Sequence, residues 1–172
     1  MEIAQINEIL RPRYSAQQLV EASGLSGVLV QQYCGRGLLR FEAAAAGGRI
    51  YRRFSYLEVL VAGALACLRN LGVFPSEAFE NVREMVGQWC TLRDEIGPDA
   101  RFAVFPEGKT PFFSRGSGSV ANCIDAIPHM PLNPLRRLPI FGKSAGFVAI
   151  DLPEIERVVR ERLGKDAPEI AP

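Results

Sequence analysis

The fold is decided by residues 11–54, which read RPRYSAQQLVEASGLSGVLVQQYCGRGLLRFEAAAAGGRIYRRF. The first part predicts a short helix, because Ser15-Ala-Gln-Gln18 is a capping-box pattern. In this pattern the side chains of a hydroxyl residue and of a Gln three residues later both accept hydrogen bonds from free backbone amides at the start of the helix. Ala16, Leu19 and Val20 lie on one side of that helix. Gly24 then predicts a sharp turn, because glycine adopts positive φ angles without steric cost.

A second helix is expected directly after this turn. Ser26 is a favourable N-cap, and Leu25, Leu29 and Tyr33 follow at helical spacing in a segment that ends near Gly35. Two short helices around a glycine turn form the helix-turn-helix pattern, whose second helix normally enters the major groove of DNA.

The segment after Gly37 predicts a β-hairpin followed by a helix. Residues 38–41 are expected to form the first strand, 43–48 a loop ending in Gly-Gly, and 49–54 the returning strand. The returning strand interleaves arginines with Tyr51 and Phe54, so the hairpin would be a basic wing beside the second helix. Ser55-Tyr-Leu-Glu58 is another capping-box pattern and predicts an apolar helix to Arg69.

Together these features resemble the MerR-like winged helix-turn-helix family over roughly residues 11–73. The resemblance rests on Tyr14-Ser15, Gly24-Leu25-Ser26, Tyr33, Gly37-Leu38-Leu39 and Tyr51-Arg52-Arg53-Phe54-Ser55, with Glu58 following. It implies that Tyr33, Tyr51, Arg52 and Arg53 bind the phosphate backbone. It also implies that the front of the second helix, with Ser26, Gly27, Val28 and Gln31, faces bases or phosphates.

The second helix departs from the family pattern. Where the family commonly has Arg-Tyr-Tyr-Glu, this chain has Gln31-Gln32-Tyr33-Cys34. The lost arginine removes a phosphate anchor, whereas Gln31 or Gln32 could read an adenine edge. Gly27 either permits a close approach to DNA or is simply tolerated. The DNA sequence that is read therefore cannot be transferred from the family.

Charge is divided unevenly along the chain. Residues 1–73 carry eight Arg against five Glu, or +3, and the remainder carries twelve basic against fourteen acidic residues, or −2. All basic residues of the first part are arginines, whose planar fork suits phosphate or guanine contacts. The expected DNA-binding residues are Arg13, Tyr14, Ser26, Gly27, Val28, Gln31, Gln32, Tyr33, Arg36, Arg49, Tyr51, Arg52 and Arg53.

Composition excludes several classes of protein. The chain has 172 residues, 48% hydrophobic, with a net charge of +1, which suits a globular fold. It has no apolar run near the ~20 residues of a membrane helix and no signal-peptide pattern, so we expect a cytoplasmic protein. Four dispersed cysteines, expected to be reduced, and a single histidine argue against metal sites, cofactors and a histidine-based catalytic triad. We therefore do not expect an enzyme.

Residues 74–97 predict a linking helix with an apolar stripe. The stripe has the three-and-four spacing of a short coiled coil and comprises Val82, Met85, Trp89, Leu92 and Ile96. It serves either as the contact of a homodimer or as core against the chain's own C-terminal half.

Residues 98–172 predict a small α+β appendage. Strands are expected at 101–105, 110–113 and 146–150, and Asp151 is expected to cap a helix that Gly164 ends, with a frayed tail from Asp166.

The chain is thus expected to be mainly α with a small amount of β, and to be a DNA-binding transcriptional regulator of bacterial or phage type that acts as a homodimer. The alternative is an antitoxin-type protein. It would bind DNA through the same module and a partner protein through Phe102, Phe105, Phe112 and Phe113 of the appendage. An enzyme with its site in the appendage is the third interpretation.

Overall fold

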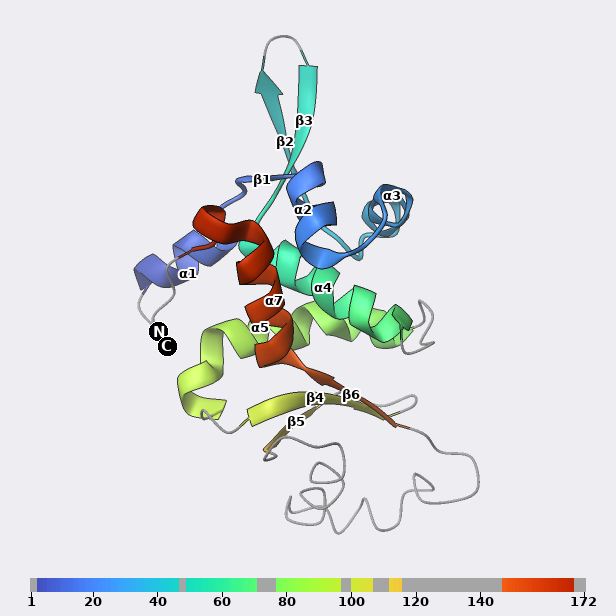
Figure 1. Ribbon diagram of the computed structural model, residues 1–172, viewed down its shortest axis with the longest axis vertical. Helices are drawn as coiled ribbons and strands as arrows, with labels where there is room; N and C mark the ends of the chain where they lie inside the picture. The colour runs from blue at the N-terminus through green and yellow to red at the C-terminus, as the bar shows by residue number, and fades with distance from the viewer. Residues whose placement is uncertain are drawn as a thin grey trace.

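The computed structural model describes residues 3–46, 49–70, 77–96, 100–106, 112–115 and 147–168, and Figure 1 shows their arrangement. Within them the chain is mostly helical with two small antiparallel sheets, which confirms the predicted class. The elements in chain order are α1 (Ile3–Leu10), β1 (Tyr14–Ser15), α2 (Ala16–Ser23), α3 (Gly27–Gly35), β2 (Glu42–Ala46), β3 (Arg49–Phe54), α4 (Tyr56–Asn70), α5 (Glu77–Ile96), β4 (Ala100–Pro106), β5 (Phe112–Arg115), β6 (Phe147–Asp151), α7 (Leu152–Leu163) and the 3-10 turn η4 (Gly164–Asp166).

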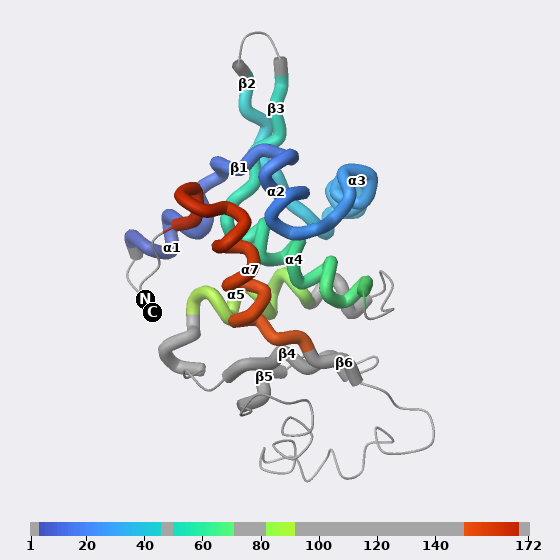
Figure 2. Tube along the Cα trace, viewed as in Figure 1, coloured from blue at the N-terminus to red at the C-terminus, as the bar shows by residue number. Residues whose placement is uncertain are grey.

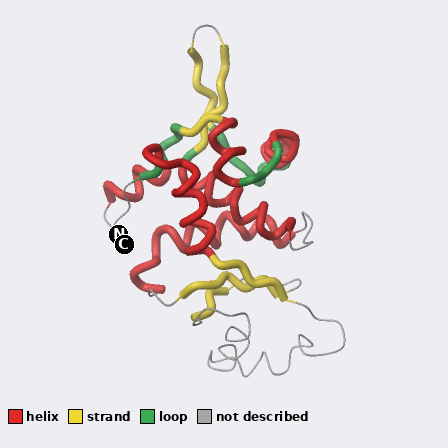
Figure 3. Tube along the Cα trace, viewed as in Figure 1, coloured by secondary structure: helices red, strands yellow, loops and turns green. Residues whose placement is uncertain are grey.

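A body of helices separates the two sheets along the longest axis of the molecule. The hairpin of β2 and β3 projects from one end, beside α2 and α3, and the sheet of β4, β5 and β6 lies at the other end (Figures 1 and 3). None of the described helices is long and apolar enough to cross a bilayer.

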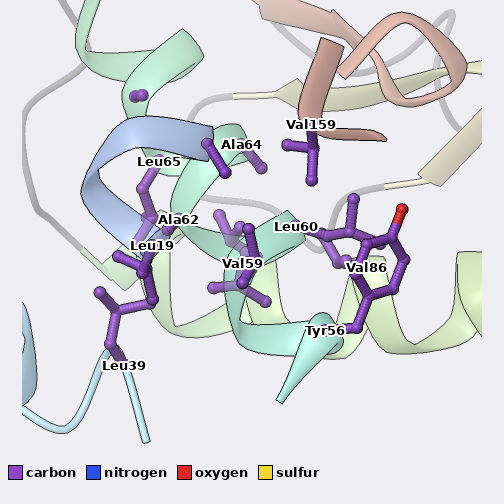
Figure 4. Close-up of a cluster of buried hydrophobic side chains, with 14 of the residues drawn as sticks. Leu19, Leu39, Tyr56, Val59, Leu60, Ala62, Ala64, Leu65, Val86 and Val159 are labelled. Atoms are coloured by element: carbon purple, nitrogen blue, oxygen red, sulfur yellow. The ribbon is translucent and has the colours of Figure 1, made fainter. Parts of the chain in front are cut away.

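Helix α4 is the centre of the core. Its sequence is apolar nearly all round, and most of its residues are buried because α2, α5 and α7 pack against it. Leu19 of α2, Val86 of α5 and Val159 of α7 meet the side chains of α4 in one continuous cluster (Figure 4). The helix predicted for this stretch is confirmed.

The first two predicted helices are also confirmed, together with their caps. The Ser15 hydroxyl accepts from the Gln18 amide at 3.2 Å, and the Gln18 side-chain oxygen accepts from the Ser15 amide at 2.9 Å. Gly24 ends α2 with φ of 78°, and the Ser26 hydroxyl accepts from the Leu29 amide at the start of α3. Local sequence chemistry is therefore sufficient to set these helix ends.

The first strand of the hairpin lies later than predicted. Residues 38–41 do not form a strand; Glu42–Ala46 does, with Glu42 opposite Arg53 and Ala46 opposite Arg49. The amides of Leu38 and Leu39 both donate to the Tyr33 carbonyl, which keeps this stretch in a turn after α3. Cross-strand pairing with β3 then makes a strand of an alanine run that has little strand propensity.

The C-terminal strands agree with prediction to within a few residues. Strand β4 lies between β5 and β6, and both pairings are antiparallel. The carboxylate of Asp151 accepts from the Glu154 amide at 3.0 Å and caps α7, and Gly164 ends that helix with φ of 55°. The side chains of the four phenylalanines proposed as a partner surface lie outside the described residues.

The last helix does not belong to a separate appendage. Helix α7 packs on both α2 and α4, and Val159 and Leu163 are buried in the same cluster as Leu19. The expectation of an appendage that begins at residue 98 is wrong for this helix, because its apolar face is covered by the N-terminal helices.

The described residues after α7, as far as Pro168, are anchored, whereas the sequence predicts fraying from Asp166. The Tyr14 hydroxyl donates to the Asp166 carbonyl oxygen at 2.7 Å, the Gln18 side-chain amide donates to the Asp166 carboxylate at 2.9 Å, and Pro168 is buried. A buried phenol requires a hydrogen-bond partner, and this carbonyl provides it.

Replacing Tyr14 with Phe is expected to lower the free energy of unfolding by about 1–2 kcal/mol, because the Asp166 carbonyl and the Arg13 guanidinium both lose a partner. Burial raises the pKa of Tyr14 above 10.0, so the contribution of the neutral phenol is complete below pH 10 and declines above it. Urea unfolding at pH 7 and pH 11 checks both statements: the difference between variant and wild type should shrink at pH 11. Equal stability of the two proteins at pH 7 would contradict the anchor.

The stripe of α5 is core in its described part. Val82, Met85 and Trp89 are buried within the chain, and α5 packs against α4. They offer no face to a second copy, so the dimer-contact interpretation is wrong for these three residues. The side chains of Leu92 and Ile96 lie outside the described residues.

Candidate nucleic-acid interface

Helix α3 presents an exposed face that carries no charge. Val28 is 66% exposed, and Gln31 and Gln32 are also exposed, at the i, i+3 and i+4 spacing that places them on one side. Val30 and Tyr33 are buried on the other side and attach the helix to the core. The exposed face therefore has apolar and amide chemistry only.

Both glycines of α3 lie in open surroundings. A Cβ atom added to Gly27 or Gly35 would meet nothing within 4 Å, and neither residue has a positive φ. Packing and backbone conformation within the described residues therefore require no glycine at either position.

The β2–β3 hairpin carries the second part of the candidate interface. Ile50 is 79% exposed, Tyr51 is 44% exposed, and the Arg52 guanidinium lies 4.7 Å from the centre of the Phe41 ring. The hairpin projects from the end of the helical body where α3 lies (Figure 2). An extended ribbon with aromatic and basic side chains beside an exposed helix suits a grooved, negatively charged surface.

Burial raises the pKa of the Cys34 thiol at the end of α3, and the nearby Arg52 guanidinium opposes this shift. The Arg52 side chain of β3 therefore lies near the last turn of α3.

Three arginines of this region are exposed and have no carboxylate partner within the described residues. They are Arg36, which follows α3, Arg40 in the turn before β2, and Arg52 on β3. By contrast, two other arginines are paired with carboxylates: Arg13 contacts Glu8 at 3.1 Å, and Arg157 contacts Glu154 at 2.8 Å. The three arginines leave an excess of positive charge beside α3, although the exposed Glu42 of β2 reduces it.

A buried ion pair holds this region on the helical body. The Glu58 carboxylate accepts hydrogen bonds from the Arg40 backbone amide at 2.8 Å and from the Arg83 guanidinium, which also donates to the Leu38 carbonyl at 2.9 Å. Glu58 therefore does not complete the predicted capping box; only the Ser55 hydroxyl takes part, accepting from the Glu58 amide at 3.3 Å. The carboxylate instead fixes the turn between α3 and the hairpin.

Two of the tyrosines expected among the DNA-binding residues, Tyr14 and Tyr33, are buried instead. Tyr14 and Tyr33 are each 1% exposed and lie in the core, where Tyr14 is bonded to Asp166. Both have large apolar rings, and burial of these rings secures β1 and α3 to the body. Their side chains cannot reach a duplex in this fold.

The remaining predicted residues divide into exposed, half-buried and undescribed groups. Ser26, Gly27, Val28, Gln31, Gln32, Arg36, Tyr51 and Arg52 are exposed. Arg13 and Arg53 are half-buried: Arg13 donates to the Tyr14 hydroxyl at 3.0 Å, and Arg53 donates to the Arg13 carbonyl at 3.2 Å. The side chain of Arg49 lies outside the described residues.

Arg40, Phe41 and Ile50 are exposed within the candidate interface, although the sequence does not predict them there. Arg40 and Phe41 were assigned to a strand, whereas the turn they occupy exposes both. Gly37, with its φ of 74°, is compatible with extended chain directly after it, so the sequence carries no signal against a strand at these residues.

No cluster of three or more His, Cys, Asp or Glu side chains suited to a metal ion occurs in the described parts of the chain. Cys34 and Cys67 are free thiols, and burial raises the pKa of both. Cys123 and His129 lie outside the described residues. In comparisons with known proteins, no family model matches the chain and no curated protein resembles it significantly.

Proposed function

We propose that the protein is a sequence-specific DNA-binding regulator of transcription, with α3 in the major groove and hairpin arginines on the flanking phosphates. In this proposal residues 11–73 work as the MerR-like winged helix-turn-helix module that they resemble. One observation carries it: an uncharged exposed helix face lies beside three arginines, Arg36, Arg40 and Arg52, which have no carboxylate partner within the described residues.

The division of chemistry between these two surfaces supports the proposal. Base edges are read by amide, apolar and charged side chains in the major groove, while phosphates are bound chiefly by arginine and lysine. Helix α3 supplies amide and apolar groups, and the arginines lie at its end and on the hairpin. Phosphate contacts fix the register and orientation of a protein on the duplex, and base contacts then give the specificity.

Replacing Arg52 with Ala is expected to weaken binding to all DNA sequences alike, because phosphates carry no sequence information. The slope of log affinity against log salt should become less steep by about one unit per protomer. The measurement is fluorescence anisotropy of the full chain on labelled duplexes at several salt concentrations. The matched control is Arg157→Ala on α7, whose guanidinium is already bonded to Glu154 and Glu161.

Two outcomes would overturn the proposed function. One is the absence of binding to any duplex, including fragments from the region upstream of the chain's own gene. The other is binding whose affinity does not change with salt, because phosphate contacts release counterions and must produce a slope near −0.9 per contact.

A further inference from the structure

The exposed face of α3 differs in chemistry from the rest of the candidate interface. Its outward side chains are Val28, Gln31 and Gln32, and the whole helix Gly27–Gly35 contains no Arg, Lys, Asp or Glu. Val28 is a branched apolar side chain held 66% exposed to solvent, although Val30, two residues later, is buried. Core packing therefore explains Val30 and leaves Val28 without an internal role.

Each base pair presents a different pattern in the major groove. Guanine is usually read by Arg or Lys and cytosine by Glu or Asp, whereas adenine is read by Asn or Gln and the thymine methyl group by apolar side chains. Helix α3 has no Arg, Lys, Asp or Glu with which to read guanine or cytosine. It exposes two Gln and one Val, which are the types that read adenine and the thymine methyl group. Its chemistry thus matches A·T pairs better than G·C pairs.

We propose that α3 reads A·T base pairs, with Gln31 bonded to the N6 and N7 atoms of an adenine and Val28 against the methyl group of a neighbouring thymine. This inference rests on the proposed function and adds the class of DNA sequence and the two residues that select it. Val28 and Gln31 are one helical turn apart, so their Cβ atoms are about 5–6 Å from each other. Stacked bases are separated by about 3.4 Å along the duplex, so the two side chains reach the same or adjacent pairs.

The glycines beside this face support a close approach. Gly27 precedes Val28 at the start of the helix, and Gly35 follows Gln32 by less than one turn. A Cβ atom added to either glycine would meet nothing within 4 Å. Short side chains at both ends allow the helix backbone to descend into the groove. A valine needs this, because its methyl groups reach only a short distance from the backbone.

The test begins with selection of duplexes from a random pool by the full chain, followed by base-analogue substitution in the selected site. Selected half-sites should contain A·T pairs at the positions protected by α3. Replacing the contacted thymine with uracil removes only its methyl group and should weaken wild-type binding about three- to fivefold. Replacing the contacted adenine with 7-deazaadenine should weaken it about tenfold.

Two variants test which residue is responsible for each loss of affinity. Val28→Ala should bind thymine and uracil sites equally, and Gln31→Ala should bind adenine and 7-deazaadenine sites equally, while each retains the response to the other analogue. Both residues are exposed, so neither variant should change the unfolding midpoint. The control is Leu10→Ala on α1, another exposed apolar side chain, which should keep the full uracil penalty.

Three outcomes would overturn the inference. Selection of G·C pairs under α3, an unchanged uracil penalty in Val28→Ala, or salt-dependent binding without base preference would each overturn it and leave DNA binding itself intact. If the full chain retained no duplex from the pool at all, the proposed function would be overturned as well.

Discussion

Replacing Arg83 with Ala is expected to lower the free energy of unfolding by about 3–5 kcal/mol. The Glu58 side chain is only 5% exposed and that of Arg83 18%, so the variant would leave a carboxylate buried with no guanidinium beside it. It would also remove the hydrogen bond from Arg83 to the Leu38 carbonyl. The measurement is chemical denaturation monitored by circular dichroism.

Two further variants separate this ion pair from a general effect of removing an arginine. Arg157→Ala removes an exposed guanidinium on α7 that contacts two carboxylates, and it should change stability little, because solvent screens exposed pairs. The double variant Glu58→Leu/Arg83→Met removes both charges and should recover much of the loss, because no unpaired charge stays buried. A double variant no more stable than Arg83→Ala would contradict this account.

The ion pair also links stability to the candidate interface. Glu58 lies on α4, Arg83 on α5, and their partners are the backbone atoms of Arg40 and Leu38 in the turn between α3 and the hairpin. If the proposed function holds, a milder variant such as Glu58→Gln should weaken DNA binding under conditions where the chain stays folded, although neither side chain would touch DNA.

Replacing Gly63 with Ala is expected to destabilise the protein by about 1–2 kcal/mol, even though alanine favours helix over glycine by about 1 kcal/mol. A Cβ atom at this position would lie 3.0 Å from the Cγ2 atom of Ile155 and 3.4 Å from that of Val159. Both neighbours are β-branched and have little freedom at χ1, so the added methyl group must displace α7 from α4.

Gly87→Ala is the matched control, and it should have the opposite sign. Gly87 lies inside α5, and a Cβ atom there would meet nothing within 4 Å, so the helix preference acts alone and stabilises by about 0.5–1 kcal/mol. Denaturation of both variants under identical conditions measures the difference. A stabilised Gly63→Ala variant would show that α7 is not packed closely on α4.

Within the described residues, the sequence predicts those exposed residues of the candidate site that lie on elements defined by short-range signals. The sequence places the outward-facing residues Gly27, Val28, Gln31 and Gln32 on the right helix, because a cap and an apolar spacing locate that helix without further information. Arg52 was likewise identified from a basic, aromatic strand. The DNA contacts expected for Tyr14 and, from the resemblance, for Tyr33 do not fit their burial, because residue type alone does not distinguish a buried aromatic ring from one that faces a ligand.

Sequence by itself determined the helix ends and the presence of a hairpin. Ser15, Gln18, Ser26 and Asp151 bond to amides three residues away, and these bonds depend on side chains that lie within one turn. Gly24 and Gly164 end helices because their positive φ angles need no distant partner. Such features are fixed by short stretches of chain, and the structure reproduces them.

Tertiary structure alone decided which groups lie at the interface and which hold it in place. The Glu58 carboxylate could cap its own helix, but in its buried position it accepts hydrogen bonds from the Arg40 amide and the Arg83 guanidinium instead. Helix α7 packs on the N-terminal helices because they bury its apolar face. Asp166 is held by hydrogen bonds from Tyr14 and Gln18. These outcomes depend on contacts between residues 18 to 152 positions apart, where competition between partners is resolved by burial and not by sequence spacing.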